Sequence, residues 1–161
     1  MKKQTVIFDL DGTLALIDKR RALAGIIPGA PEASNPQMDW KAFLDPKNIP
    51  FDEPNVPVIK MAQLLKSQGY TIVIFSGRSK ATKDATNDWL NRYDVPCDVL
   101  KMRPTSNPWH YMKDADLKKH WLNDIFPDKS DIFAVFDDRQ QVVDMWRDNG
   151  LTVFQVADGD F

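Results

Sequence analysis

The feature that most constrains this chain is a short apolar run that ends in two carboxylates and a glycine, residues 6–13 (VIFDLDGT). Side chains alternate along an extended strand, so Asp9 and Asp11 are expected on the same side of it. Two like charges this close repel at neutral pH unless a cation lies between them or one carboxyl keeps its proton. Gly12 can turn the chain sharply, and Thr13 offers a hydroxyl and an amide to an anion. The stretch predicts a chemical site at a strand end, with a surface turn of the Asp-Gly kind as the alternative.

Length, charge and cysteine content limit the classes of protein. The chain has 161 residues, 43% of them hydrophobic, and a net charge of −2. A chain of this length can bury a core without disulfides, so one domain over residues 1–161 is expected. The charge argues against coating of nucleic acid or of an anionic membrane through a basic face. Cys97 has no partner for a disulfide, no apolar run reaches the ~20 residues that cross a bilayer, and residues 1–3 lead into the first strand without a secretion signal. We therefore expect a cytoplasmic protein without a membrane partner.

Apolar runs of strand length alternate with segments of helical periodicity over most of the chain. Strands are expected at residues 5–8, 70–75, 99–102, 132–136 and 152–156. Amphipathic or helical segments are expected at residues 19–27, 79–92 and 114–126, around residues 58–65 and around residues 142–146. Strands joined through helices pair in parallel through right-handed crossovers. The pattern predicts a three-layer α/β/α, Rossmann-like fold with a mainly parallel central sheet, whose ligands bind beyond the carboxyl ends of the strands.

Residues 14–57 interrupt this alternation and hold seven of the eleven prolines. We expect a proline-rich loop or small cap over the mouth of the site, with one helical turn at residues 39–44. Trp40, Phe43 and Phe51 favour an ordered segment. They either help this excursion close as a lid or form a small satellite core beneath it.

Polar side chains follow directly after several of the buried strands and are expected at one edge of the sheet: Asp9, Asp11, Ser76, Arg78, Asp137 and Asp138. Carboxylates without His or Cys among them suit Mg²⁺. Ser76, the backbone amides that follow it from Gly77 on, and a lysine suit a phosphate. A phosphoryl group bridged to Mg²⁺ and held by a cation is the usual arrangement for phosphoryl transfer. Asp9 is placed to attack as a nucleophile and form an aspartyl-phosphate, and Asp11 to protonate the leaving oxygen and then accept a proton from water.

These residues resemble, in order, the four motifs of the haloacid dehalogenase superfamily of phosphatases: Asp9 to Thr13, Ser76 after the second strand, Lys118, and Asp137-Asp138. Dehalogenases and P-type ATPases of this superfamily generally lack an acid at the second Asp position, so Asp11 indicates a phosphatase or phosphomutase. Residues 135–147 and 154–161 also look like the 3′-phosphatase domain of bacteriophage-type polynucleotide kinase. The resemblance runs from the first strand to the last residue, except in the proline-rich stretch, which is longer here.

The resemblance implies a role for each matching position. Asp9 is the nucleophile, and Asp11 is the acid/base, with its backbone carbonyl on the metal. Asp138 is the metal carboxylate, and Asp137 supports it or holds a metal-bound water. Lys118 matches the lysine that neutralises the phosphate. Residues that the family also needs are matched by Arg20, Arg78 and Asp114.

A loop beginning at Arg103 adds a candidate substrate contact, because its Trp109, His110 and Tyr111 could stack a base near the edge of the site. Core packing or an ordinary surface is the alternative for these residues. Spacing assigns no catalytic role to His110 or His120.

The motif residues also have ordinary structural interpretations. Asp137 and Asp138 could cap the helix that follows them. Residues 76–78 could form a plain turn. Lys118 could form a surface ion pair with Asp114, four residues earlier on the same helix face.

The expected activity is that of a Mg²⁺-dependent phosphomonoesterase that removes 3′-terminal phosphates from DNA or RNA during end repair. The first alternative is a nucleotidase, or another phosphatase of small phosphoesters, acting on nucleoside monophosphates; the net charge leans toward it. A remote alternative is a phospho-receiver signalling domain, in which the acid pair follows the first strand and the phosphoacceptor the third. Kinase activity is not expected, because no GxxxxGK[ST] loop is present. Oligomerisation is compatible with the sequence, which has no signature of a particular state.

Overall fold

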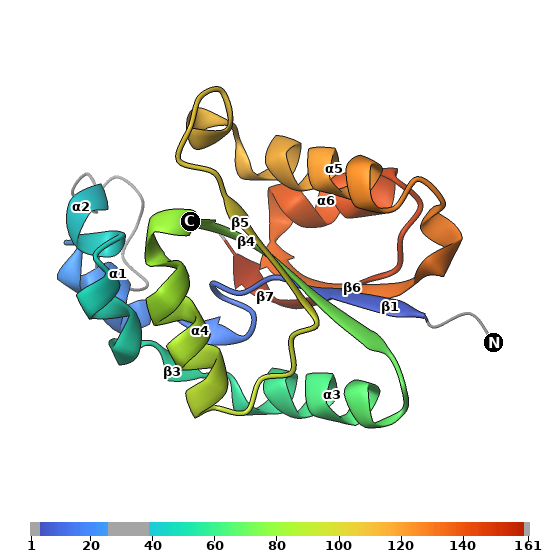
Figure 1. The fold of residues 1–161 in the computed structure, drawn as a ribbon, viewed down its shortest axis with the longest axis horizontal. Helices are drawn as coiled ribbons and strands as arrows, with labels where there is room; N and C mark the ends of the chain where they lie inside the picture. Colours follow the sequence, from blue (N-terminus) through green and yellow to red (C-terminus); the bar gives the residue numbers. More distant parts are fainter. Residues whose placement is uncertain (1–3, 26–38, 160–161) are drawn as a thin grey trace.

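A five-stranded sheet in the order β5-β4-β1-β6-β7 carries the fold (Figure 1). The structure is a computed structural model, and it describes residues 4–25 and 39–159. The strands are β1 (Thr5–Phe8), β4 (Thr71–Ser79), β5 (Val99–Arg103), β6 (Ile132–Arg139) and β7 (Val153–Gly159). Every neighbouring pair is parallel, so all five carboxyl ends lie at one edge. The prediction of a parallel α/β sheet is confirmed.

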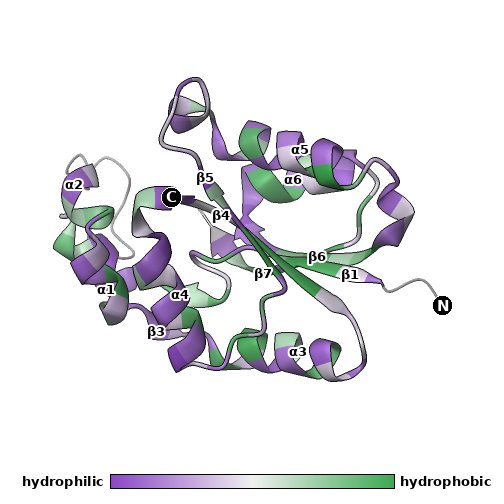
Figure 2. Ribbon diagram, viewed as in Figure 1, coloured by the Kyte–Doolittle hydropathy of each residue, from purple (hydrophilic) through white to green (hydrophobic). Residues whose placement is uncertain are grey.

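Helices cover both faces of the sheet (Figure 1). One face carries α3 (Val56–Ser67) and α4 (Lys83–Arg92), and the other carries α5 (Asp114–Ile125) and α6 (Gln140–Asp148). The central strand β1 feeds both cores, because Val6 and Phe8 pack toward the first pair of helices and Ile7 toward the second. Hydrophobic residues accordingly line the inner sides of the helices and the strands between them (Figure 2). The three-layer prediction is confirmed.

The described part of the proline-rich excursion, residues 14–25 and 39–57, contains short elements beside the carboxyl edge of the sheet, and this part is called the cap below. They are β2 (Ala15–Leu16), α1 (Asp18–Leu23), α2 (Trp40–Phe43), a 3-10 helix (Pro46–Phe51) and β3 (Glu53–Pro54). Strands β2 and β3 pair antiparallel and bring the two ends of the excursion together. The single helical turn predicted at residues 39–44 is confirmed. The segment predicted at residues 19–27 is a helix from Asp18 to Leu23, and its last two residues lie outside the described part of the chain.

The sequence does not predict the β2–β3 pair or the 3-10 helix. Two-residue strands have no periodicity, and the 3-10 helix contains Pro50. Of the three aromatic residues of the excursion, Phe43 is buried, whereas Trp40 and Phe51 are exposed. Lid closure and the single-domain extent stay predictions.

Three strands, β4, β6 and β7, continue at least three residues further than the apolar pattern predicts. Strand β4 runs to Ser79 instead of residue 75, and β6 runs to Arg139 instead of residue 136. The backbone ladder continues there, although the side chains become polar, because neighbouring strands still supply hydrogen-bonding partners. A register irregularity marks each extension, between Ser76 and Ser79 and between Asp137 and Arg139. Residues 76–78 therefore belong to a strand, and their interpretation as a plain turn is wrong.

Candidate active site

Three buried carboxylates lie at the carboxyl ends of β1 and β6: Asp9, Asp137 and Asp138. Each offers an oxygen that lies within 4.8 Å of the others, and each residue is at most 6% exposed. The parallel pairing of Phe8 with Phe136 brings these strand ends together, and the Asp9 amide donates to the carbonyl of Phe136 at 2.9 Å. The local sequence of two strands thus builds one acidic cluster.

Lys118 reaches this cluster from the first turns of α5. Its Nζ donates to Asp9 Oδ1 at 2.6 Å and to Asp137 Oδ2 at 3.2 Å, and it lies 3.4 Å from Asp114 Oδ2. Burial acts to lower the pKa of Lys118, but the charges of Asp114, Asp137 and Asp9 outweigh it and raise the pKa well above its usual value. Since the Lys118 side chain is 1% exposed, the interpretation as a surface ion pair is wrong.

The cluster carries more negative charge than Lys118 compensates. Burial raises the pKa of Asp9 well above its usual value despite the opposing effect of Lys118. Burial and the neighbouring Asp137 raise the pKa of Asp138 to about 6. Three crowded carboxylates without a nitrogen or sulfur ligand suit a hard divalent cation. The donor set therefore fits a divalent metal.

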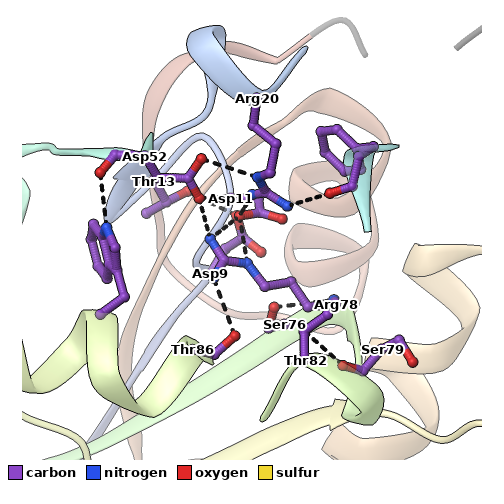
Figure 3. A network of polar contacts seen from close by, with 12 residues as sticks. Asp9, Asp11, Thr13, Arg20, Asp52, Ser76, Arg78, Ser79, Thr82 and Thr86 are labelled. Atoms are coloured by element: carbon purple, nitrogen blue, oxygen red, sulfur yellow. Dashed lines mark hydrogen bonds and ion pairs between the residues drawn. The ribbon is translucent and has the colours of Figure 1, made fainter. Parts of the chain in front are cut away.

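Asp11 belongs to a second charged network that contains two arginines (Figure 3). Its Oδ1 accepts from Arg20 Nη2 at 2.6 Å, and from Arg78 Nε at 2.8 Å and Nη2 at 2.6 Å. Burial acts to raise the pKa of Asp11, but the charges of both arginines outweigh it and lower the pKa to about 2. The carboxylate of Asp11 is not in the group of three acids described above. A metal contact through its backbone carbonyl stays a prediction.

Strand alternation does not extend as far as Asp11. Strand β1 ends at Phe8, and Asp11 forms an isolated bridge with Ala15 after the chain has begun to turn. The carboxylates of Asp9 and Asp11 consequently contact different cations, the first a lysine and the second two arginines. The turn needs glycine, because Gly12 has φ +85°.

Asp52 completes the second network and is a residue that sequence reasoning missed. It is 1% exposed and lies between the 3-10 helix and β3. Its carboxylate accepts from Arg20 Nε at 3.0 Å and Nη2 at 2.9 Å, and from Arg78 Nη2 at 2.7 Å (Figure 3). Burial raises its pKa to about 6 even though both arginines act to lower it. Charge balance could have indicated such a residue, because two buried arginines beside one carboxylate call for a second acid.

Further contacts hold the two arginines in place. Arg20 lies over the ring of Phe43, 4.4 Å from its centroid, and donates to the Phe43 carbonyl at 3.3 Å. Arg78 Nη1 donates to Thr86 Oγ1 at 3.2 Å. The excursion and α4 therefore both take part in positioning Asp11.

Of the positions predicted to bind phosphate, Thr13 contacts the acidic cluster directly. The Thr13 hydroxyl donates to Asp9 Oδ2 at 3.1 Å and also lies 3.3 Å from Asp138 Oδ1, so it contacts two acids of the cluster. The hydroxyl oxygen of the buried Ser76 accepts a hydrogen bond from the backbone amide of Arg78 at 3.2 Å. A Cβ at Gly77 would lie 2.5 Å from Asp114 Oδ1, so a side chain at this position would have to displace the Asp114 carboxylate.

Arg103 holds the loop that follows β5 onto the site. Its Nε donates to the Gly77 carbonyl at 3.1 Å, and its Nη1 donates to the carbonyls of Trp109 at 3.0 Å and Met112 at 2.6 Å. Its Nη2 lies 3.4 Å from Asp114 Oδ1. These contacts order the loop, and a direct contact of Arg103 with substrate stays a prediction.

The aromatic residues of this loop differ in exposure. The side chain of Tyr111 is 81% exposed, with His110 against it at 4.7 Å between ring centroids. Trp109 packs on His120 at 4.4 Å between centroids. His120 therefore supports the loop through this contact.

Comparison with known proteins identifies a matching family and a curated relative. The family described as polynucleotide kinase PNKP phosphatase domain matches residues 36–161. The chain is 33% identical over 158 residues to the "Putative bifunctional polynucleotide kinase/RNA ligase" of Autographa californica nuclear polyhedrosis virus. The match covers 96% of this chain and 19% of that protein. The chain thus spans about a fifth of the length of this curated relative.

Two solved structures are similar to this chain. A chain of the Pnkp1/Rnl/Hen1 RNA repair complex superimposes with a TM-score of 0.74 and 33% identity, over 99% of this chain and 44% of that one. A phosphoserine phosphatase in apo form has a TM-score of 0.60 at 18% identity, over 95% of this chain and 86% of that one, which shows a shared fold. Within residues 4–25 and 39–159, no helix is long and apolar enough to cross a bilayer.

Proposed function

This chain belongs to the family of polynucleotide kinase PNKP phosphatase domains, and from that premise we propose that it removes 3′-terminal phosphates from nucleic-acid ends with the help of Mg²⁺. The observation that carries the proposal is the 2.6 Å contact between Lys118 Nζ and Asp9 Oδ1 inside the acidic cluster. A buried lysine beside a buried carboxylate can neutralise a phosphate that the carboxylate attacks. The phosphatase activity itself follows from family membership.

Asp9 is the proposed nucleophile. A bond forms between a carboxylate oxygen of Asp9 and phosphorus, while the bond from phosphorus to the 3′-oxygen of the leaving group breaks. Water then attacks phosphorus, the bond to Asp9 breaks, and phosphate is released. Asp9, Asp137 and Asp138 would hold Mg²⁺, which supplies charge neutralisation for the phosphoryl oxygens.

Asp11 is the proposed acid and base. Paired with Arg20 and Arg78, it is ionised at neutral pH, which suits removal of a proton from the attacking water. The acid role requires a proton, and a phosphate dianion close to Asp11 raises the pKa of that carboxyl. The two arginines fix the position of the carboxylate in both steps.

RNA ends are the proposed substrate class. One similar protein is described as a polynucleotide kinase/RNA ligase, and another is a chain of an RNA repair complex. The loop at residues 104–112 adds exposed aromatic surface through Tyr111, and aromatic faces stack bases without sequence preference. A chain end presents a base next to its terminal phosphate, whereas a generic small ester does not.

Comparison of substrates tests the proposal. The values of kcat/KM are to be measured with Mg²⁺ on a 3′-phosphorylated RNA oligonucleotide, the matched DNA, 3′- and 5′-mononucleotides and a chromogenic phosphate ester. We expect the RNA oligonucleotide to exceed the mononucleotides at least tenfold. Equal or better values on mononucleotides would replace end repair with the nucleotidase alternative.

A further inference from the structure

We propose that strand β7 positions the carboxylate of Asp138 for cation binding, through Gly159 and Gln155. The inference rests on the proposed function, in which Asp138 is a cation ligand. It assigns a role in the active site to a strand that carries none of the four sequence motifs.

Two glycines enclose one oxygen of Asp138. A Cβ at Gly12 and a Cβ at Gly159 would each lie closer than 3.0 Å to Asp138 Oδ2. The Thr13 hydroxyl lies 3.3 Å from the other oxygen, Oδ1. The Asp138 carboxylate is therefore confined from three directions and has little freedom to rotate.

Gly159 is required for space. At Gly12 the positive φ already favours glycine, but the φ of Gly159 lies outside that region. A Cβ at Gly159 would lie 2.6 Å from Asp138 Oδ2, 2.7 Å from Arg139 Cα and 2.8 Å from Arg139 N. Two of these atoms belong to the backbone of β6 and cannot move aside alone. A methyl group at this position must displace the end of β7, the Asp138 carboxylate, or both.

The register of β7 explains this close approach. Asp137 pairs with Gln155, and Arg139 pairs with Gly159. Between these two pairs the chain advances two residues along β6 but four residues along β7. Asp138 lies within the irregularity, where Gln155 Nε2 donates to its backbone carbonyl at 3.2 Å. The same Nε2 donates to Gln140 Oε1 at 3.0 Å. Strand β7 thus contacts both the main chain and the side chain of Asp138.

Fixing this carboxylate matters for a cation that tolerates little distortion. Mg²⁺ requires nearly octahedral oxygen ligands at about 2.0–2.1 Å. Residues that orient metal ligands typically change metal affinity about 10- to 100-fold when they are mutated. Gly159 and Gln155 are accordingly positioning residues. Their substitution is expected to weaken cation binding although the residues that bind the cation stay the same.

The test compares Gly159→Ala with Asp158→Ala, a change at the exposed neighbour on the same strand. Binding of Mn²⁺ is measured by electron paramagnetic resonance, together with the Mg²⁺ concentration for half-maximal rate and the melting temperature. We expect Gly159→Ala to weaken Mn²⁺ binding about tenfold or more, to raise the Mg²⁺ requirement likewise, and to regain most of its rate at high Mg²⁺. Asp158→Ala keeps all three values.

A second pair of variants covers the case in which Gly159→Ala does not fold. Gln155→Ala removes the donor to the Asp138 carbonyl. Gln140→Ala keeps that donor and removes the other acceptor of the same amide, together with an exposed hydrogen bond from Gln140 Nε2 to Asp144 Oδ1. Mn²⁺ binding that is weaker in Gln155→Ala but not in Gln140→Ala supports the inference. The inference is overturned if Gly159→Ala binds Mn²⁺ as tightly as the wild type does, or if Gln155→Ala and Gln140→Ala bind it equally tightly. A wild-type protein that binds no Mn²⁺ would instead contradict the metal site of the proposed function.

Discussion

Asp52 and Arg20 form a bidentate pair inside the protein, with Arg20 Nε on Oδ1 at 3.0 Å and Nη2 on Oδ2 at 2.9 Å. Both side chains are at most 1% exposed. The second arginine, Arg78, shares Oδ2 at 2.7 Å, so one acid from the cap orients both cations that hold Asp11. The cap and the reaction centre are therefore coupled by charge.

Asp52→Asn is expected to impair catalysis. An amide of the same size has one acceptor oxygen instead of two, so it cannot keep the contacts of Asp52 with both Arg20 and Arg78. The position of Asp11 then changes, so we expect kcat to fall at least tenfold. Steady-state kinetics measures the fall in kcat, and urea unfolding checks that the variant remains folded.

The matched control is Glu53→Gln at the next position. Glu53 pairs with Lys19 at 2.6 Å, but both side chains are more than half exposed, and such pairs contribute about 0–1 kcal/mol. Equal effects of the two substitutions would show that the buried network does not depend on Asp52.

The metal-free protein is expected to lose stability as the pH rises from about 4 to about 6. Asp52 and Asp138 have pKa values of about 6 in the folded protein against 3.8 for an unperturbed aspartate. The folded state therefore binds more protons than the unfolded state in this window, and the unfolding free energy falls with rising pH, by up to about 3 kcal/mol for each group.

Urea titrations in a chelator at pH 4.5 and pH 7 measure this difference. Addition of Mg²⁺ at pH 7 is expected to restore much of the lost stability, because the cation binds the ionised acids. A metal-free protein that is more stable at pH 7 than at pH 4.5 would contradict the prediction.

Asp9→Asn is expected to abolish turnover while the fold remains intact. The amide cannot attack phosphorus, but it keeps the size of the carboxylate and can still accept a hydrogen bond from Lys118. Acid quenching of the wild-type enzyme with a ³²P-labelled substrate should trap labelled protein, and the variant should give none. Retained activity in Asp9→Asn would exclude the covalent route.

Tyr111→Ala is expected to weaken binding of oligonucleotides specifically. Removal of one stacking aromatic typically costs about 1–3 kcal/mol, so KM for a 3′-phosphorylated oligonucleotide should rise about fivefold or more. The ring is 81% exposed, and the substitution should leave stability and kcat/KM on a chromogenic ester unchanged. An equal loss on both substrates would argue against base stacking by this loop.

The acidic cluster could be predicted because each contributor is adjacent in sequence to a buried strand. Apolar runs at residues 5–8 and 132–136 identify two strands, and parallel pairing then brings Asp9 next to Asp137 and Asp138. The ends of β4 and β6 could not be predicted, since backbone pairing continues there under polar side chains. The 3-10 helix and the two-residue strands of the cap also lack a periodic signal.

The parallel α/β fold and the three acids at its carboxyl edge follow from local sequence, because strand periodicity and the residues after each strand are local properties. The partners of the charged groups depend instead on tertiary structure. Asp52 lies 32 residues from Arg20 and 26 from Arg78, and pairing of β2 with β3 brings the cap onto the site. Gly159 meets Asp138 through a register irregularity between two strands. Such contacts depend on how the chain closes in space, which neither composition nor periodicity specifies.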